Sequence, residues 1–333
     1  MIISRTPHRI SFFGGGTDYP DYYLKHCGKV LGACVDKYCY LSVRRLPPFF
    51  DHKHRIVYSK IENVSDINTI IHPSVRETLK YFKVDYGVSI HHDGDIPARS
   101  GMGSSSAFTV GLIHSLYALQ GRIVSKEDLT REAIHIEQEL IRENVGSQDQ
   151  TFAAHGGLNV ISFLANGKII VEPIVINPDR LVEFESSLIL VYTGISRIAS
   201  EVAGDKIRNI PKNEKNLSYM KDIVDEAYDI LVNSNRDLGE FGRLMSQSWN
   251  LKKTLSTRVS NQEIDTIYER ALASGAVGGK LLGAGGGGFM VFFVEREKQA
   301  AFKHALSDYL HVPFSFDFDG SKIIVYQPQR RPL

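Results

Sequence analysis

Residues 96–107 read IPARSGMGSSSA and run directly into the apolar segment Phe108–Leu116. Glycine allows backbone conformations that are closed to other residues and lets a ligand approach the chain closely. Serines at a helix start place hydroxyl groups beside backbone N–H groups that have no partner within the helix. The stretch therefore predicts either an anion-binding loop at the positive end of a helix dipole or a flexible surface loop that caps a helix.

The composition is that of an ordinary globular protein. The 333 residues are 43% hydrophobic and 23% charged, which is enough material for two packed domains. Lys plus Arg number 39 against 38 Asp plus Glu, and this balance gives no support for a nucleic-acid or membrane partner. The chain shows no secretory leader and no segment of membrane-spanning length, so we expect a cytoplasmic protein. The oligomeric state has no signal in the sequence.

The three cysteines, Cys27, Cys34 and Cys39, lie in one short region. Their number is odd, and their spacings of seven and five residues match no zinc-binding pattern. They predict buried free thiols in a reducing compartment.

The first half of the chain is rich in predicted strands. Short β-branched or aromatic runs bounded by Gly, Pro or Asp predict strands at residues 9–13, 30–35, 38–45, 54–58, 86–91, 158–163 and 168–176. One helix is expected to start in the serine loop. A second is signalled by the capping-box pattern Ser125–Asp128 and by helical spacing of Leu129, Ala133, Ile136 and Leu140.

The second half is richer in predicted helices. Helices are expected at residues 220–231, 238–251, 264–273 and 298–309, with Gly275 ending the third. Strands are expected at residues 188–192, 289–294, 313–318 and 322–326. Because strands and helices mix irregularly, the sequence favours an α+β fold over a doubly wound parallel sheet.

A second glycine-rich segment, KLLGAGGGGF, occupies residues 280–289. Gly283, Gly285 and Gly288 satisfy G-x-G-x-x-G, but the strand-like run FMVFFV follows where a dinucleotide site needs a helix. A Walker A loop is excluded because Leu281 follows Lys280. Each glycine lowers the free energy of unfolding by up to about 1 kcal/mol relative to alanine, because it loses more backbone entropy on folding. Five glycines in six residues are therefore a poor choice for a simple tight turn, and we interpret them as allowing close approach of the backbone to a ligand.

Two acidic residues are further candidates for binding a ligand or a metal ion. Asp18, in GGGTDY after the first strand, suits either sugar hydroxyls or an ordinary turn. Glu137 lies at the edge of its helix's apolar stripe and is expected to be partly buried. Taken by itself, it favours a salt bridge over a magnesium ion as its partner. The segment GSQDQ follows at residues 146–150.

In combination these motifs are recognisable. HRISFFGGGTDY, IPARSGMGSSSA, GSQDQ and KLLGAGGGGF, in this order over residues 8–289, resemble the motifs of the GHMP superfamily of galactokinase, homoserine, mevalonate and phosphomevalonate kinases. The resemblance implies an N-terminal domain like ribosomal protein S5 domain 2, expected at residues 1–180. It further implies a C-terminal ferredoxin-like domain, expected at residues 181–333, with the active site in the cleft between the two, ATP as donor and Mg²⁺ as cofactor.

The resemblance also implies roles for single residues. Asp149 takes the place of the family's catalytic aspartate and Arg9 that of its cationic partner, while Ser105 and Glu137 match the magnesium ligands. The loop of residues 283–288 resembles the segment that packs against the serine loop and closes the site. The residues expected at the ATP phosphates are Ser100, Gly101, Met102, Gly103, Ser104, Ser105 and Ser106.

The form of the first motif bears on the acceptor. Galactokinases carry Glu-His where this chain has Gly15 and Gly16, which argues against galactose. The motifs resemble most the subgroup that phosphorylates the anomeric hydroxyl of D-glycero-D-manno-heptose 7-phosphate for nucleotide-activated heptose synthesis, and next the kinase part of fucokinases. A substrate phosphate needs cationic or N–H contacts, for which Arg197 and Lys280 are candidates, each equally readable as a solvated surface charge. The expected substrate-binding set is Gly15, Gly16, Thr17, Asp18, Arg197, Lys280, Gly285 and Gly286.

Three rival functions are weighed against this one. The glycine-loop contexts disfavour a dinucleotide oxidoreductase. A fucokinase- or galactokinase-like kinase of a neutral sugar would keep the same catalytic residues. A catalytically silent sugar sensor on the same fold would not need Asp149, Ser105 and Glu137 together.

Overall fold

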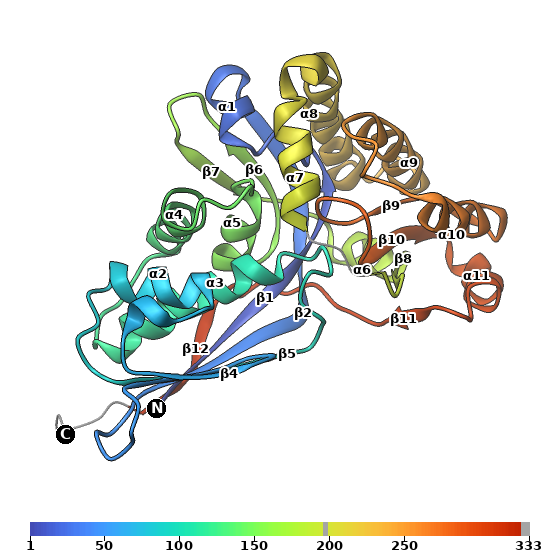
Figure 1. Ribbon diagram of the computed structural model, residues 1–333. Coiled ribbons are helices and arrows are strands. Elements are labelled where there is room, and N and C mark those ends of the chain that lie inside the picture. Colours follow the sequence, from blue (N-terminus) through green and yellow to red (C-terminus); the bar gives the residue numbers. More distant parts are fainter. Residues whose placement is uncertain (196–198, 328–333) are drawn as a thin grey trace.

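The computed structural model describes residues 1–195 and 199–327, which form two lobes (Figure 1). The first lobe is built on a mixed sheet with β1 (Ile2–Phe13) and β2 (Gly28–Arg45) at its centre. β2 pairs antiparallel with β6 (Leu158–Phe163) along its first part and with β5 (Val88–Gly94) along its last part. The sheet is extended by β3 (His54–Val57), β4 (Ile61–Val64) and β7 (Ile169–Pro173).

Helices cover one face of this sheet (Figure 1). α3 (Ser104–Leu119) lies across β1 and β2, and most of its residues are buried. The other helices of this lobe are α1 (Pro20–His26), α2 (Pro73–Tyr81), α4 (Lys126–His135) and α5 (Gln148–His155). The helix start predicted at Ser125 is confirmed, since Ser125 is the N-cap and its Oγ accepts the N–H of Asp128 at 3.0 Å. The helix expected to reach Leu140 changes into a π-helical turn at Ile136–Leu140.

The second lobe contains a four-stranded antiparallel sheet in the order β11-β8-β10-β9. Helices separate the first strand from the second and the third from the fourth in chain order, and the spatial order of the strands is 4-1-3-2, which confirms the ferredoxin-like expectation. Its strands are β8 (Leu188–Tyr192), β9 (Ala276–Leu281), β10 (Phe289–Val294) and β11 (Leu310–Val312). Its helices are α6 (Pro178–Ser186), α7 (Ala199–Arg208), α8 (Ile210–Val232), α9 (Gly239–Thr254), α10 (Gln262–Ala273) and α11 (Gln299–Ala305).

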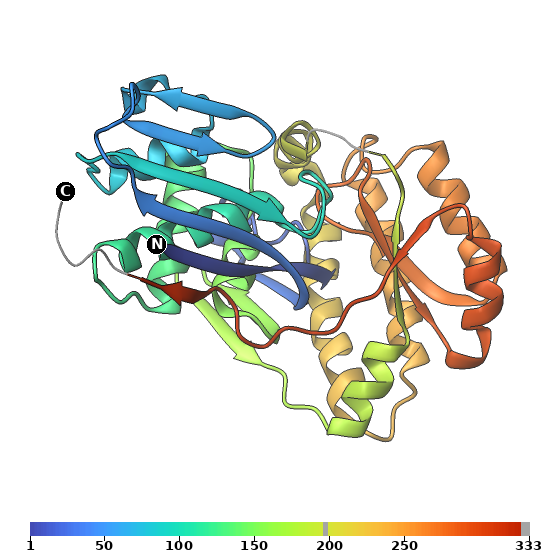
Figure 2. The same ribbon diagram turned by 90° about the horizontal axis from the view of Figure 1, so that it is seen from below.

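The end of the chain departs from two expectations. β12 (Lys322–Tyr326) pairs antiparallel with β1, so it belongs to the first sheet although we expected the second domain to run through residue 333. The strand expected at residues 313–318 does not form, and only Phe316 makes a single bridge with Val35. The reason is that this segment crosses from one lobe to the other between β11 and β12 (Figure 2).

The two lobes share one hydrophobic core. Phe12 and Phe13 at the end of β1 pack edge-to-face on Phe241 of α9, with ring centroids 5.4 and 4.9 Å apart. Phe184 of α6 lies 4.7 Å from the same ring, and all four side chains are fully buried. Such aromatic pairs contribute beyond their buried area. The end of β1 is therefore held in a fixed position relative to the second lobe.

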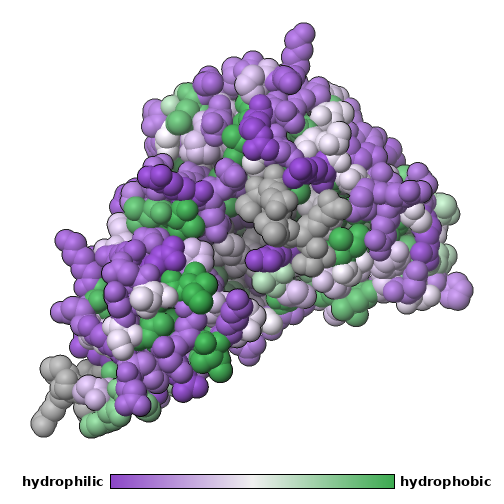
Figure 3. Space-filling model, in the orientation of Figure 1, coloured by the Kyte–Doolittle hydropathy of each residue, from purple (hydrophilic) through white to green (hydrophobic). Residues whose placement is uncertain are grey.

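The surface and the thiols fit the composition. Figure 3 shows a mainly hydrophilic face on both lobes, with hydrophobic residues in small separate patches. No helix in the described ranges is long and apolar enough to cross a membrane. Cys34 and Cys39 are buried free thiols as expected, whereas Cys27 is only partly buried.

Candidate active site

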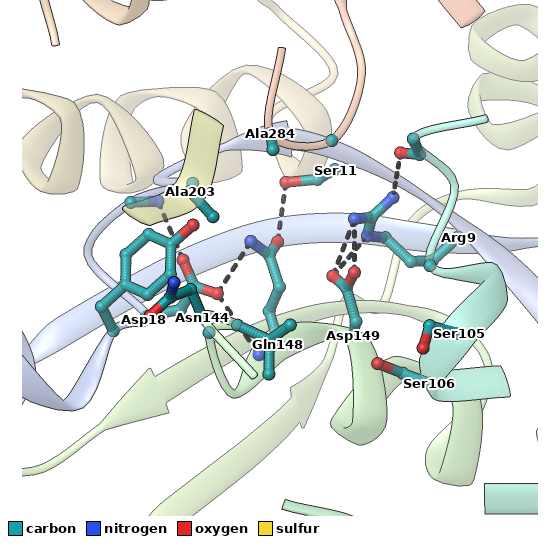
Figure 4. A pocket seen from close by; sticks show the side chains of 18 of the residues that line it. Arg9, Ser11, Asp18, Ser105, Ser106, Asn144, Gln148, Asp149, Ala203 and Ala284 are labelled. Carbon is teal, nitrogen blue, oxygen red and sulfur yellow. Dashed lines mark hydrogen bonds and ion pairs between the residues drawn. The ribbon is translucent and has the colours of Figure 1, made fainter. Parts of the chain in front are cut away.

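Arg9 and Asp149 form a two-point ion pair at the junction of the lobes. Nε of Arg9 donates to Oδ1 of Asp149 at 2.9 Å and Nη2 donates to Oδ2 at 2.8 Å (Figure 4). Arg9 projects from β1, and its Nη1 also donates to the carbonyl of Gly101 at 2.8 Å. Asp149 lies in the first turn of α5 and keeps 27% of its side chain exposed, against 4% for Arg9. The pair thus fixes the direction of a carboxylate that still faces open space.

The serine-glycine loop leads to this ion pair. Gly103 is the N-cap of α3 and has a φ of +77°, a left-handed conformation that favours glycine. A Cβ atom at Gly103 would lie 3.5 Å from the carboxyl carbon of Asp149. The unpaired N–H groups of the first turn of α3 therefore lie beside Asp149, where a phosphate would be favoured.

The loop residues differ in their surroundings. Gly101, Gly103 and the three serines Ser104–Ser106 line the cavity. Met102 is fully buried in the core, and its carbonyl accepts the backbone N–H of Arg9 at 3.1 Å. Ser100 is also buried, so Ser100 and Met102 support the loop from behind rather than facing the cavity.

The second glycine loop packs directly on the first, as expected. A Cβ atom at Gly283 would lie 2.6 Å from Cα of Gly101, and one at Gly288 would lie 2.1 Å from the carbonyl oxygen of Ser100. The N–H of Phe289 donates to that same carbonyl at 3.1 Å. At Gly288 the neighbour is protein backbone rather than a ligand, whereas Gly283 packs on Gly101 and also lines the cavity.

The other side of the cavity is a polar network around Asp18. Its Oδ1 accepts the N–H of Gly16 at 2.8 Å, and its Oδ2 accepts Nε2 of Gln148 at 3.0 Å. Ser11 Oγ donates to Oε1 of Gln148 at 2.8 Å and thereby orients the amide (Figure 4). Burial raises the pKa of Asp18, and the Gly16 N–H and the Lys206 ammonium act against that rise. A side chain that is so buried and that accepts hydrogen bonds from Gln148, far away in the sequence, is not an ordinary turn residue.

Several expected substrate residues lie elsewhere. The Thr17 hydroxyl donates to the carbonyls of Gly14 and Lys29, so this buried side chain closes the turn instead of facing the cavity. Gly285 and Gly286 pack on the backbone of Val259 and are not part of the cavity wall. Gly15 and Gly16 do line the cavity. Arg197 lies outside the described residues.

Three buried lysines contribute to the cavity wall. Lys280 donates to the carbonyl of Phe12 at 2.5 Å, and burial lowers its pKa to about 7. It is 2% exposed, so the reading as a solvated surface charge is wrong. Lys252 of α9 donates to the carbonyls of Leu281 and Gly283 at 2.8 and 2.7 Å and braces the second glycine loop. The third is Lys206 of α7.

Glu137 is fully buried in the π-helical turn rather than partly buried at a helix edge. Its Oε2 accepts Ser106 Oγ at 2.9 Å and Nε2 of Gln150 at 2.5 Å, and no salt bridge reaches it from any described residue, so that expectation is wrong. Its Oε1 accepts no hydrogen bond from any described residue, and burial raises the pKa of Glu137 to about 7 against the opposing effect of the Thr109, Ser106 and Gln150 side chains. Ser106 is its serine neighbour, whereas Ser105 is exposed at the cavity.

An unpaired carboxylate oxygen in a buried position fits a bound cation. Burying a charge without a partner is costly, and Mg²⁺ takes oxygen ligands, usually one or two carboxylates beside substrate phosphates. Glu137 Oε1 meets this requirement behind the serine loop, and the Ser105 hydroxyl is available at the cavity side.

These groups surround one cavity of about 260 Å³ between the lobes. The serine loop lies on one side, the Asp18 network on the other, and Arg9 with Asp149 between them (Figure 4). Sequence reasoning missed Ser11, Gln148, Lys206 and Lys252. Gln148 falls inside the GSQDQ motif and could have been found, whereas the two lysines lie in helices with no local signal.

Comparisons with known proteins agree with this architecture. The family model "GHMP kinases N terminal domain" matches residues 69–157, and "GHMP kinases C terminal" matches residues 224–312. The D-glycero-alpha-D-manno-heptose 7-phosphate kinase of Campylobacter jejuni is 32% identical over 96% of this chain and 98% of that protein. The bifunctional fucokinase/GDP-fucose pyrophosphorylase of Arabidopsis thaliana is 26% identical over 88% of this chain but only 30% of its own length.

A solved structure supports the fold. The D-glycero-D-manno-heptose 1-phosphate kinase of Bacteroides thetaiotaomicron has a TM-score of 0.79 with 24% identity and covers 96% of this chain and 98% of that one. The family models and the Campylobacter relative decide the family. The chain therefore belongs to the GHMP kinases and is an ATP-dependent sugar kinase of that family.

Proposed function

We propose that the protein transfers the γ-phosphoryl group of ATP to the anomeric (C1) hydroxyl of D-glycero-D-manno-heptose 7-phosphate. The observation that carries this proposal is the position of Asp149, which lies between a phosphate-type helix terminus and the buried Asp18 network in one cavity. Such an arrangement suits a reaction that needs positioning and charge neutralisation more than covalent chemistry.

Asp149 accepts the proton of the attacking hydroxyl in this proposal. Arg9 holds the carboxylate at two points and places a positive charge near the transferred group. The N–H groups at the start of α3 bind the nucleotide phosphates. Glu137 and Ser105 would hold Mg²⁺, which neutralises phosphate charge when it is bound.

The choice of heptose phosphate rests on two supports. The relative of that name is 32% identical over nearly the whole chain. In addition, a Cβ atom at Gly15 would lie 3.5 Å from Ser11 Oγ and 3.7 Å from Gln148 Nε2, so the glycine leaves space on the acceptor side for a longer sugar. Lys280 and Arg197 remain our candidates for the substrate's existing phosphate.

The test measures ADP release from Mg·ATP with D-glycero-D-manno-heptose 7-phosphate, L-fucose, D-galactose, D-mannose and mevalonate. We expect turnover of the heptose phosphate alone. Turnover of a neutral sugar instead would keep the role of Asp149 and refute the phosphorylated acceptor. Binding of sugars without any ADP release would favour a sensor.

A further inference from the structure

Lys206 differs from the other two buried lysines of the cavity. Lys252 and Lys280 both donate hydrogen bonds to main-chain carbonyls, which explains why their ammonium groups are buried. Lys206 is 6% exposed, yet none of the described residues forms a hydrogen bond or ion pair with its ammonium group. Among the described residues, the Tyr19 ring faces this ammonium group, with its centroid 5.7 Å from Nζ.

Lys206 lies on the side of the cavity that holds the Asp18 network, where the acceptor sugar is proposed to bind. Lys206 and Ala203 lie three residues apart on α7, so they share a helix face, and both line the cavity. Figure 4 shows Ala203 on the same side as Asp18 and away from the serine loop. The charged groups that act on Lys206 are Asp18, Asp149 and Arg9.

The Lys206 side chain is largely buried and lines the cavity, and none of the described residues accepts a hydrogen bond from its ammonium group, so a ligand in the cavity that accepts one would stabilise the charge. We propose that Lys206 is an acceptor-binding residue that donates a hydrogen bond to a sugar hydroxyl, which in turn donates to Asp18. This proposal rests on the proposed function, because it requires the acceptor sugar to occupy this side of the cavity.

The chemistry of Asp18 favours a hydroxyl over the substrate's phosphate as the ligand of Lys206. A hydroxyl accepts from the ammonium and donates to the carboxylate at the same time, whereas a phosphate would be repelled by Asp18. Asp18 has capacity for this bond. A carboxylate offers about four acceptor sites, and Asp18 uses three, for the N–H of Gly16 and for Nε2 and the N–H of Gln148.

The experiment compares Lys206→Met with Lys212→Met, an exposed position at the start of α8. Lys206→Met should lower kcat/KM for the heptose phosphate at least about 30-fold, the loss expected for a hydrogen bond to a charged group. The KM for ATP should stay within about twofold of the wild-type value, since the serine loop is unchanged. Lys206→Arg, which keeps the charge, should recover part of the loss. Lys212→Met should behave as the wild type.

Calorimetry with the heptose 7-phosphate and with the unphosphorylated heptose identifies the group that Lys206 binds. An equal loss of affinity for both sugars in Lys206→Met supports the hydroxyl. A loss confined to the phosphorylated sugar overturns the assignment, and so does unchanged affinity for both in a variant with a wild-type melting temperature.

The two proposals fail in different ways. If the wild type turns over another sugar of the panel, the proposed acceptor is wrong, and the Lys206 comparison is repeated with that sugar. A roughly 30-fold lower kcat/KM of Lys206→Met with that sugar supports Lys206 as an acceptor-binding residue. An unchanged kcat/KM refutes that role. A wild-type protein that binds none of the sugars overturns both.

Discussion

Gly101 and Gly283 join the two lobes by backbone contact, since a Cβ atom on Gly283 would lie 2.6 Å from Cα of Gly101. The two residues have φ angles of +83° and +65°. The serine loop therefore depends on the second lobe for its shape. A side chain at either glycine would push the loops apart and displace the N–H groups at the start of α3.

We expect Gly283→Ala to raise the KM for ATP and to lower kcat together. Gly167→Ala is the matched control, because Gly167 has a φ of +82° but nothing within 4 Å of its Cβ position. The control should lose about 1 kcal/mol of unfolding free energy from backbone strain alone, and Gly283→Ala should lose 1–3 kcal/mol more from overpacking. Steady-state kinetics measure KM and kcat of the two variants, and urea unfolding measures their stability. Equal behaviour of the two variants would contradict the contact.

Asp149→Asn should lower kcat by about 10²- to 10⁴-fold, the usual contribution of a general base. The amide oxygen can keep one of the two hydrogen bonds from Arg9, whereas the amide nitrogen cannot accept the other, so the melting temperature and the KM for ATP are measured beside kcat to separate a disturbed Arg9 from a lost base. Asp179→Asn, at an exposed position of α6, serves as the control. Near-normal turnover of Asp149→Asn would remove Asp149 from the proton transfer.

Much of the secondary structure and one contact between loops could be predicted from local sequence motifs. The strands that follow apolar runs, the N-cap at Ser125 and the contact of the two glycine loops all depend on neighbours in the sequence or on the family pattern. The burial of Glu137 could not be predicted, because it depends on Ser106 and Gln150 closing over it from α3 and α5.

Other features depend on contacts between distant parts of the chain. β12 crosses back to pair with β1, and nothing in residues 322–326 distinguishes this pairing from one within the second sheet. The short helices α1, α2 and α5 were not predicted; α5 has no clear apolar period, whereas α2 begins at Pro73 and buries Val75 and Leu79 at helical spacing, a signal that the sequence did contain. Lys206 was missed because its surroundings, Tyr19 and Asp18, lie almost two hundred residues away in the sequence.

Ser11→Ala should weaken acceptor binding without affecting ATP. The Ser11 hydroxyl donates to Gln148 Oε1, and this bond leaves Nε2 facing Asp18. Its loss should cost about 1 kcal/mol and raise the KM for the sugar by about 3- to 10-fold. Ser186→Ala, at an exposed end of α6, is the control. A selective rise in the KM for ATP would instead assign Ser11 to the nucleotide side.

Lys206→Met should make the ligand-free protein more stable at pH 7. Burial lowers the pKa of Lys206 from 10.5 to about 8, against the opposing effect of Asp18 and Asp149. Between pH 8 and 10.5 the Lys206 side chain is protonated in the unfolded chain but largely neutral in the folded one. The contribution of Lys206 therefore makes the unfolding free energy of the wild type rise with pH in this range. Below pH 8 the side chain is charged in both states, and its destabilising effect is complete. Removing it should add about 1–3 kcal/mol at pH 7 and make the rise from pH 8 to 10.5 less steep, with the remaining rise due to the lowered pKa values of Lys252 and Lys280. Urea unfolding across this range measures the difference. A variant less stable than the wild type at pH 7 would show that Lys206 has a structural partner.

Glu137→Gln should weaken the magnesium dependence of nucleotide binding. The amide can keep the bonds with Ser106 and Gln150, but the negative charge at the unpaired oxygen is lost. A ligand that binds only the native state raises the melting temperature. The melting temperature of the wild type should therefore rise more with Mg·ATP than with ATP and EDTA. In Glu137→Gln the two increases should be equal. The apparent magnesium affinity should fall about 10- to 100-fold.

Glu139→Gln separates the charge of Glu137 from a general effect of removing a carboxylate, because Glu139 lies two residues away in the same turn and is exposed. It should respond to magnesium as the wild type does. If Glu137→Gln also responds normally, the buried carboxylate holds the serine loop through Ser106 and takes no part in binding the metal. The melting temperatures without ligand then decide that structural role, since loss of a loop support would lower them and removal of an unpaired buried charge would raise them.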